Sequence, residues 1–389
     1  MTHRRAAYDN IVICAPVTIP YRRYSTHSAH WWLGRSLHEL TRAAGITPKD
    51  IDGLTVSSFT VGPDTAIGLT QHFGLSPRWL DHIPFGGASG VVALRRAARA
   101  VQAGDADIVA CISGDTNHVD SFRKTLSTFS RFAQDAVYPY GSGGANSSFA
   151  LITKHYMNLY GAKREDFGKL CIAQRDNALS IPFAMMKKKL TLDEYMSARP
   201  IADPVHLFDC VMPCAGAEAV LVCREDTAKS LGLPMVRMLA TIERHNAFGG
   251  DVIQHRGGWE VDIGELWAMA GMRPSDVSLV ETYDDYPVIV MMQFEDLGFC
   301  KKGEGPDFVR GHTFTNDGTF PHNTSGGQLS TGQAGAAGGF LGLTDAVRQL
   351  TDRPIGTAVA DAQSAVISGF GMINYDRGLS SAAAVLARV

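Results

Sequence analysis

An internal repeat constrains most strongly what this chain can fold into. Segments 39–51 and 265–277, which lie 226 positions apart, both read E-L-x-x-x-A-G-h-x-P-x-D-h, where h is an apolar residue. The spacing predicts, in each copy, a helix that ends at a glycine and a Pro-x-Asp turn that leads into an apolar strand. Two copies of one helix–turn–strand unit predict two similar α/β halves.

A second echo supports the same division. Glycine-rich segment 86–90 opens one predicted helix, and segment 335–339 opens another over 340–350. Because both echoes occur in the same order, duplication is favoured over chance. We therefore expect a pseudo-twofold arrangement in which the two turns face one another. The expected halves span 1–235, including a long loop region at about 117–200, and 236–389.

The first glycine-rich turn has the features of a ligand-binding helix start. Segment 84–104 reads PFGGASGVVALRRAARAVQAG, and its helical part places apolar residues at helical spacing. A short apolar run, 107–112, follows and is typical of a buried parallel strand. Such a turn directs backbone N–H groups into a pocket where an oxyanion or a thioester oxygen could be held. The alternative is a tight connection that uses glycine only for close packing.

Composition excludes several classes of protein. The 389 residues carry a formal net charge of −3 and no long charge run, which gives no case for binding to nucleic acid or to an acidic membrane. No apolar run approaches the roughly 20 residues of a membrane span, and the N-terminus lacks a signal-peptide pattern. Seven cysteines without a CxxC motif favour buried, reduced thiols. We therefore expect a cytoplasmic α/β protein.

Four stretches carry a family resemblance. They are GGASGVVALRRAARAVQAGDADIV at 86–109, DCVMPCAGAEAVLV at 209–222, YDDYPVIVMMQFEDLGFCKKGEGPDFV at 283–309 and HNTSGGQLSTGQAGAAGG at 322–339. With them the chain resembles the thiolase superfamily, and within it the sterol-carrier-protein type of thiolase, over nearly its whole length. The resemblance implies an α/β fold of two duplicated βαβαβαββ halves in a five-layer α-β-α-β-α sandwich. It also implies a homodimer and a coenzyme A thioester as the ligand.

The chain departs from thiolases where their chemistry is done. Thiolases have a nucleophilic cysteine in C-A-S-G, and this chain reads Gly87-Ala88-Ser89-Gly90. Tyr283-Asp284-Asp285-Tyr286 replaces a His-Asp-Cys-Phe-like motif, and Gln333-Ala334-Gly335-Ala336 replaces His-Pro-x-Gly. No cysteine follows Cys300 to match the family's second catalytic cysteine. Since thiolysis through an acyl-enzyme needs a thiolate and a base, we do not expect ordinary thiolysis.

The chain is similar to a subgroup that also lacks the cysteine. Those members cleave carbon–carbon bonds of β-hydroxyacyl-CoA substrates, including steroid side chains, by retro-aldol chemistry, in complex with a small OB-fold, zinc-ribbon partner. The similarity lies in the missing cysteine and in Tyr283, whereas Gln333 stands where the aldolases have a second tyrosine. A retro-aldol step needs no covalent link to the protein, and no metal is expected in this chain.

Three acidic or phenolic residues are candidates for the proton transfer. Tyr283 is either the base or an amphipathic side chain at a strand end. Asp284 and Asp285 are either the base, with a pKa raised by burial, or caps of a turn or helix. The sequence leaves these alternatives open.

The remaining candidates come from the glycine-rich loops. By resemblance, His322 and Asn323 face the site, although a solvent-facing loop histidine is the alternative. Gln333 either contacts a thioester carbonyl or satisfies its own loop. Gly87 and Ser89 are expected to provide shape and N–H donors, and Gly335 to line the coenzyme A site. His118, Tyr138 and Tyr140 are expected in a loop over the pocket or at a dimer interface.

Three functions remain open at this point. The first, which we favour, is a thiolase-like acyl-CoA carbon–carbon lyase that works without a cysteine nucleophile. The second is a thiolase-type acyltransferase whose missing groups come from a partner subunit. The third is a catalytically silent subunit that binds coenzyme A or a partner.

Overall fold

The computed structural model describes residues 7–119, 139, 141–142 and 144–389. The first half alternates strands and helices and ends in two antiparallel strands, as the sequence predicts. Its elements are β1 (Ile11–Arg22), α1 (Ala29–Ala44), β2 (Gly53–Ser57), α2 (Ala66–Phe73), β3 (Trp79–His82), η2 (Gly86–Ala88), α3 (Ser89–Ala103), β4 (Ile108–Asp115) and β7 (Ala215–Arg224).

An inserted region precedes β7, and the second half follows it. The insertion contains α6 (Ala145–Tyr160), α7 (Arg164–Ala178), α8 (Leu192–Met196), β5 (Pro200–Ala202) and β6 (Val205–His206). The second half contains α9 (Glu225–Ser230), β8 (Met235–His245), α10 (Trp259–Ala270), β9 (Leu279–Glu281), α11 (Pro287–Asp296), α12 (Gly305–Gly311), α13 (Gly327–Ser330), η6 (Gly335–Ala337), α14 (Gly338–Leu350), β10 (Ser364–Asn374) and β11 (Arg377–Arg388). The predicted boundary at 235/236 falls at the start of β8.

The two halves form mirror-ordered half-sheets. The strand order is β3-β2-β4-β7-β1-β8-β11-β10-β9, and the halves join through a short antiparallel ladder between β1 and β8. Outward from this joint, the first half runs β1, β7, β4 and β2, and the second half runs β8, β11, β10 and β9. In both halves these are the first, the last, the penultimate and the second strand. The order therefore agrees with the pseudo-twofold arrangement that the repeat predicts.

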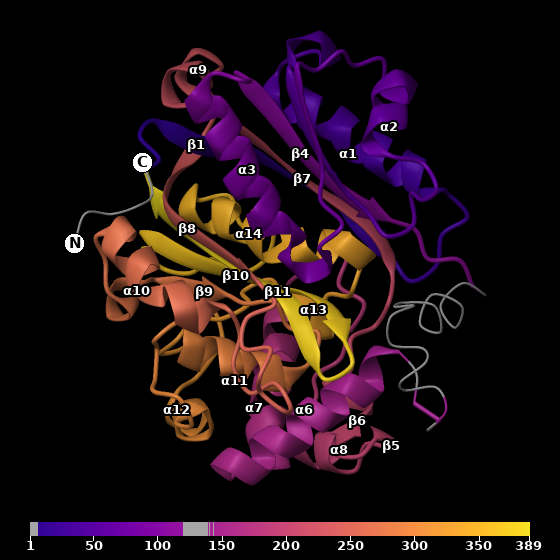
Figure 1. The fold of residues 1–389 in the computed structure, drawn as a ribbon, viewed down its shortest axis with the longest axis vertical. Helices are drawn as coiled ribbons and strands as arrows, with labels where there is room; N and C mark the ends of the chain where they lie inside the picture. The colour runs from indigo at the N-terminus through magenta and orange to yellow at the C-terminus, as the bar shows by residue number, and fades with distance from the viewer. Residues whose placement is uncertain (1–6, 120–138, 140, 143) are drawn as a thin grey trace.

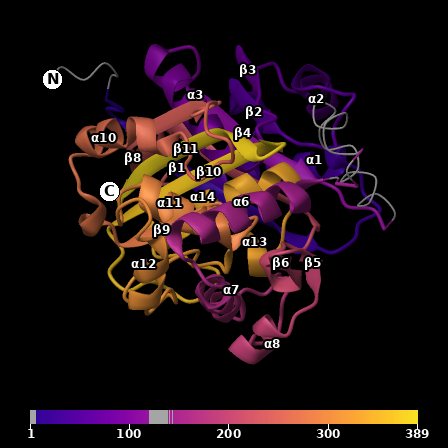
Figure 2. The same cartoon turned by 60° about the horizontal axis from the view of Figure 1, so that its bottom comes forward.

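Three hydrophobic clusters separate five layers. One lies between the half-sheets and includes apolar residues of α3 and α14. Figure 1 shows these two helices in the middle of the molecule. A second packs α1 on the outer face of the first half-sheet, and a third packs α10 and α11 on the outer face of the second. The predicted α-β-α-β-α sandwich is confirmed. In Figure 2, α7, α8, β5 and β6 lie together below the sheet, and the region at about 117–200 contains the helices α6, α7 and α8 beside its loop segments.

The sequence repeat has one structure in both copies. Helices α1 and α10 end at Gly45 and Gly271, whose φ angles of 66° and 64° lie in the left-handed region that glycine tolerates. After each, an aspartate accepts a backbone N–H three residues earlier, Thr47 N to Asp50 at 2.7 Å and Arg273 N to Asp276 at 2.9 Å. The repeated Pro-x-Asp is thus the cap of a short turn that leads into β2 or β9.

The halves differ in their third strand. In the first half β3 pairs with β2 over four residues, whereas its counterpart in the described part of the second half is one bridge between Val280 and His322. The next residue, Asn323, has a φ of 44°, which ends the extended conformation. The chain leaves the ladder at Asn323, and loop 323–328 forms at the end of β9.

The candidate residues Tyr138 and Tyr140 lie outside the described residues, whereas His118 is described. Among the described helices, none is both long enough and apolar enough to cross a membrane.

Candidate active site

The two glycine-rich turns touch each other between the half-sheets. The 3-10 turns η2 and η6 each begin with a left-handed glycine, Gly86 at φ 55° and Gly335 at φ 59°, and run into α3 and α14. A β-carbon on Gly90 would overlap the carbonyl oxygen of Gly339. The turns therefore face one another, as predicted.

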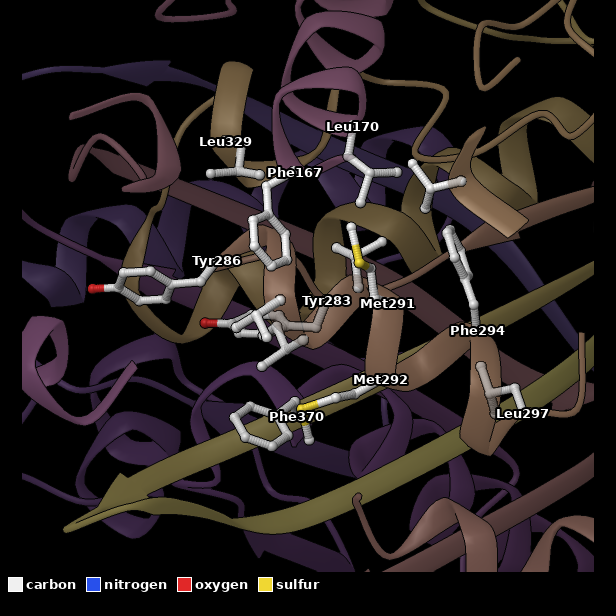
Figure 3. Packing of buried hydrophobic residues seen from close by; sticks show 14 of the residues in the cluster. Phe167, Leu170, Tyr283, Tyr286, Met291, Met292, Phe294, Leu297, Leu329 and Phe370 are labelled. Carbon is white, nitrogen blue, oxygen red and sulfur yellow. The ribbon is translucent and has the colours of Figure 1, made fainter. Parts of the chain in front are cut away.

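Tyr283 packs against Gly87, the position at which the resemblance places the thiolase nucleophile. It follows the end of β9 by two residues and is 6% exposed. A β-carbon on Gly87 would overlap the ring of Tyr283 and the carbonyl oxygen of Phe370. Figure 3 shows Tyr283 beside Phe370, with its hydroxyl directed the same way as that of Tyr286. In this arrangement a cysteine side chain at position 87 would have no room.

The Tyr283 hydroxyl lies between an amide and a carboxylate. Nε2 of Gln333 donates to it at 2.8 Å, and the charge of Asp285 acts on it from the other side. Burial, followed by the charge of Asp285, raises the pKa of Tyr283 well above its ordinary value. The phenol is therefore neutral and acts as a hydrogen-bond donor rather than as a phenolate.

Gln333 is fixed by its backbone. Its N–H donates to the carbonyl of Met212 at 2.9 Å, and its carbonyl accepts from Cys214 N at 2.9 Å. The side-chain Oε1 is buried without a partner among the described residues. The 212–214 segment thus aims Gln333 at Tyr283, while its Oε1 stays buried and unpaired.

Asp285 combines partial exposure with a perturbed carboxyl. The residue is partly exposed, yet its Oδ1 is buried and has no hydrogen-bond partner among the described groups. Burial raises its pKa to about 7, the hydrogen bond from Tyr283 opposes this rise, and the charge of Asp284 adds to it. A carboxyl that titrates near neutrality suits a general base.

Asp284 anchors the neighbouring loop. It is 1% exposed and accepts the N–H groups of Gln328 at 2.9 Å and Leu329 at 3.1 Å, which caps α13. Burial outweighs these bonds and raises the pKa of Asp284 to about 7. The geometry favours the helix-cap alternative for this residue.

Asn323 and His322 are both interior residues. Asn323 Oδ1 accepts Thr282 N at 2.8 Å and so braces the end of β9. His322 is 0% exposed, its Nε2 lies 2.8 Å from the Thr282 hydroxyl, and its ring packs edge-on against Phe294. Burial lowers the pKa of His322 to about 3, so the imidazole is neutral. The solvent-facing alternative for His322 is wrong, and we leave this residue out of the catalytic set.

Ser89 closes its own turn. Its hydroxyl donates to the Ile83 carbonyl at 3.0 Å and accepts Phe85 N at 3.1 Å, and its N–H donates to Gly86 O. These bonds use the N–H that the sequence suggested for a ligand. The expectation of a free donor at Ser89 is therefore corrected, whereas the Gly87 N–H takes no part in the two bonds that close η2.

Sequence reasoning missed Asp115, the last residue of β4. This buried carboxylate accepts Ala336 N at 2.7 Å from η6, and also Thr60 N at 2.7 Å and the Ser58 hydroxyl at 2.8 Å. A β-carbon on Gly335 would overlap it. The available signal was a charged residue at the end of an apolar strand, but its partner lies 221 positions further along the chain.

Comparisons with known proteins agree with this geometry. Residues 265–387 match the family described as thiolase C-terminal domain-like. The chain is 31% identical to a Mycobacterium tuberculosis protein named 17-hydroxy-3-oxo-4-pregnene-20-carboxyl-CoA lyase, over 85% of this chain and 88% of that protein. It is 30% identical to a steroid side-chain-cleaving aldolase of Thermomonospora curvata, over 78% of this chain and 81% of that protein.

Solved structures share the fold. A chain of a structure called the Ltp2-ChsH2(DUF35) aldolase superposes with a TM-score of 0.83 at 23% identity, over 97% of this chain and 98% of that one. A monomeric SCP2-thiolase-like protein of Mycobacterium smegmatis superposes with a TM-score of 0.72 at 15% identity, over 98% of this chain and 77% of that one.

Proposed function

This chain belongs to the thiolase superfamily and to its thiolase-like aldolase subgroup, and on that premise we propose that it cleaves a β-hydroxyacyl-CoA thioester by a retro-aldol reaction. The bond that breaks joins the α-carbon of the thioester to the hydroxyl-bearing β-carbon. No covalent acyl-enzyme forms. The products are a ketone or aldehyde and a shorter acyl-CoA.

One observation carries the proposal. The ring of Tyr283 fills the space beside Gly87 in which a nucleophilic side chain would stand. Thiolase chemistry needs a thiolate at this point, whereas a retro-aldol step needs only a base for the hydroxyl and donors for the enolate. The polar groups around Tyr283 provide this base and these donors.

The proton follows a short route in this proposal. Asp285, as the carboxylate, accepts the β-hydroxyl proton either directly or through Tyr283, whose own proton then moves to Asp285. As the carbonyl forms, the electrons of the broken bond pass to the α-carbon and the thioester oxygen. The enolate takes the proton back at its α-carbon, so the reaction is balanced without a co-reactant.

Backbone and amide donors hold the developing negative charge. We assign the Gly87 N–H to the thioester oxygen, because the turn leaves it unused and a positive helix end stands behind it. Gln333 holds the phenol in place through Nε2 and presents Oε1 to the ligand. Gly335 provides close approach on the opposite turn, and Asn323 braces Thr282 behind Tyr283.

The names of the relatives suggest the substrate class. Two relatives, at 31% and 30% identity, are named for steroid acyl-CoA or steroid side-chain cleavage. We infer a steroid-like acyl-CoA with a tertiary β-hydroxyl. We also infer a small OB-fold, zinc-ribbon partner, which the name of the superposed Ltp2-ChsH2(DUF35) aldolase supports. The homodimer is inferred from the family resemblance alone.

The test uses 17-hydroxy-3-oxo-4-pregnene-20-carboxyl-CoA, with the purified chain alone and with a DUF35-type partner. We expect release of the 17-ketone together with propionyl-CoA, and no loss of activity after alkylation with iodoacetamide. Failure to release either product with the partner present, or acyl transfer to free coenzyme A instead, would overturn the proposal.

A further inference from the structure

A small cavity lies on the inner side of Tyr283. It has a volume of about 20 Å³ and is enclosed by the end of β9, loop 323–328 and the first turn of α14. Tyr283 and Asp284 line one part of its wall, and Glu281 lines another. A cavity of this size has room for one water molecule where polar groups surround it.

Unpaired polar atoms line the same cavity. Ser325 and Gln328 are 3% and 2% exposed, and neither Ser325 Oγ nor Gln328 Oε1 has a hydrogen-bond partner among the described residues. Nδ2 of Asn323, on the same wall, points toward Asp284 without a well-formed bond. Buried polar groups are rarely left unpaired, and one water can donate to both Oγ and Oε1.

Beside the cavity, one hydroxyl touches two buried carboxyl groups. Thr324 Oγ1 lies 2.7 Å from Glu281 Oε1 and 2.5 Å from Asp345 Oδ2, and Glu281 Oε1 also accepts Thr324 N at 3.0 Å. A hydroxyl carries one proton and can donate to only one of the two. The other contact therefore needs a proton that a carboxyl group supplies.

The charges around Glu281 and Asp345 also favour one proton shared by the two carboxyl groups. Arg348, one turn after Asp345 on α14, is the cation that faces the pair, and it also faces Glu218 of β7. Glu218 accepts the hydroxyls of Thr18, Tyr21 and Thr344, and these bonds, with the charge of Arg348, oppose the rise of its pKa to about 7 that burial causes. Asp284 adds a further acid at the end of β9. With acids in excess of cations, one proton shared by Glu281 and Asp345 relieves the repulsion.

We propose that the cavity binds one structural water and that Glu281 and Asp345 share one proton across Thr324, which forms a buried proton-holding network directly behind the active site. In this network Asp345 donates to Thr324, which donates to Glu281. Both acids are positioning residues that hold loop 323–328. The inference stands whichever reaction the site performs, because it concerns the interior and is tested on the folded protein.

Two buried aspartates provide a matched test. Asp345→Asn places a permanent donor against Thr324, so its free energy of unfolding at pH 7 should equal or exceed that of the wild type. Asp166→Asn instead breaks the forked ion pair with Arg310 and should lower it. Equal destabilisation by the two variants would overturn the shared proton.

The pH dependence gives a second readout. Burial raises the pKa values of Glu281 and Asp345 above those of the unfolded chain, and the charge of Asp345 adds to the rise at Glu281. Stability should therefore fall as pH rises from the unfolded carboxyl range through the raised values. In Asp345→Asn this fall of stability with pH should be smaller. Thr324→Val should lower the free energy of unfolding, and Thr324→Ser, which keeps the hydroxyl, should restore it. An unchanged pH slope in Asp345→Asn would contradict the proposal.

Infrared spectroscopy and crystallography test the proton and the water separately. The infrared difference between the wild type and Asp345→Asn near neutral pH should contain the C=O stretch of one protonated buried carboxyl, above the bands of the other acids whose pKa values are raised. A high-resolution crystal structure should show one ordered water within hydrogen-bond distance of Ser325 Oγ and Gln328 Oε1. An empty cavity, or a carboxyl signal unchanged by the substitution, would refute the corresponding half of the proposal.

Discussion

The two glycine-rich turns have nearly the same backbone and opposite surroundings. Each begins with a left-handed glycine and opens a helix of the central layer. The second N–H of η6, from Ala336, is bound by the carboxylate of Asp115, whereas the equivalent N–H of η2, from Gly87, is not used by its turn. Only η2 presents an unused donor at this position.

The strand registers show how the difference arises. Ala110 of β4 and Val366 of β10 occupy equivalent positions beside β2 and β9, so Asp115 corresponds to Gly371. A β-carbon on Gly371 would overlap the Phe85 carbonyl oxygen, and without a side chain it brings no carboxylate to η2. The two halves thus carry equivalent turns, and a carboxylate occupies the N–H of only the second. In the proposed reaction the first half offers bare backbone to the substrate, and the second half offers the side chains that follow β9.

The largest predicted effect on kcat/KM is at Asp285, in the half that provides the side chains after β9. Asp285→Asn removes the proposed base and should lower kcat/KM by about 100- to 10,000-fold. Because the pKa of Asp285 is raised to about 7, wild-type kcat/KM should increase as pH rises through 7, and the variant should lose this limb. A pH profile checks this, with Asp284→Asn as the control. That variant should keep the limb, shifted to lower pH because the charge of Asp284 helps to raise the pKa of Asp285, and should be less stable because Asp284 caps α13.

On the backbone half, Gly87→Ala should lower kcat/KM by at least about 100-fold, because the new methyl group displaces Tyr283 and misplaces the reacting groups. The matched change in the other turn, Ala336→Gly, adds no atom and should cost less than about tenfold. Steady-state kinetics, with thermal unfolding to show that both variants fold, compares them. Equal losses would mean that the two turns are equivalent.

Gln333→Ala removes the amide that holds the phenol and should lower kcat/KM by about tenfold, the cost of one hydrogen bond of roughly 1–1.5 kcal/mol. Because the backbone bonds to Met212 and Cys214 remain, the melting temperature should change little. A large fall in melting temperature without loss of activity would assign Gln333 to its loop alone.

The smallest effect on activity is expected for Asp115→Asn. The amide leaves Ala336 N with a weaker acceptor and should destabilise the protein by about 1–3 kcal/mol, with only a few-fold loss in kcat/KM. Urea unfolding and steady-state kinetics of the same variant measure the loss of stability and the loss of activity separately. A loss in kcat/KM as large as that of Gly87→Ala would place substrate against η6 instead of η2.

Local sequence predicted the fold because the repeated cap and the glycine turns are short-range features. The site was predictable in part, since Tyr283, Asp285 and Gln333 stand at motif positions. It could not be predicted that the Ser89 N–H is used within its turn or that His322 packs among aromatic rings, because both depend on tertiary contacts. The contact of Asp115 with η6 could not be predicted for the same reason, since its partner is distant in the chain.

The central claim is that a neutral phenol has taken the place of the thiolase nucleophile. Tyr283→Phe tests it most directly, because the ring still fills the space beside Gly87 and only one oxygen is removed. With the partner present and a β-hydroxyacyl-CoA as substrate, we predict a loss of kcat/KM of about 100-fold or more with an unchanged melting temperature. Full activity in this variant would contradict the account.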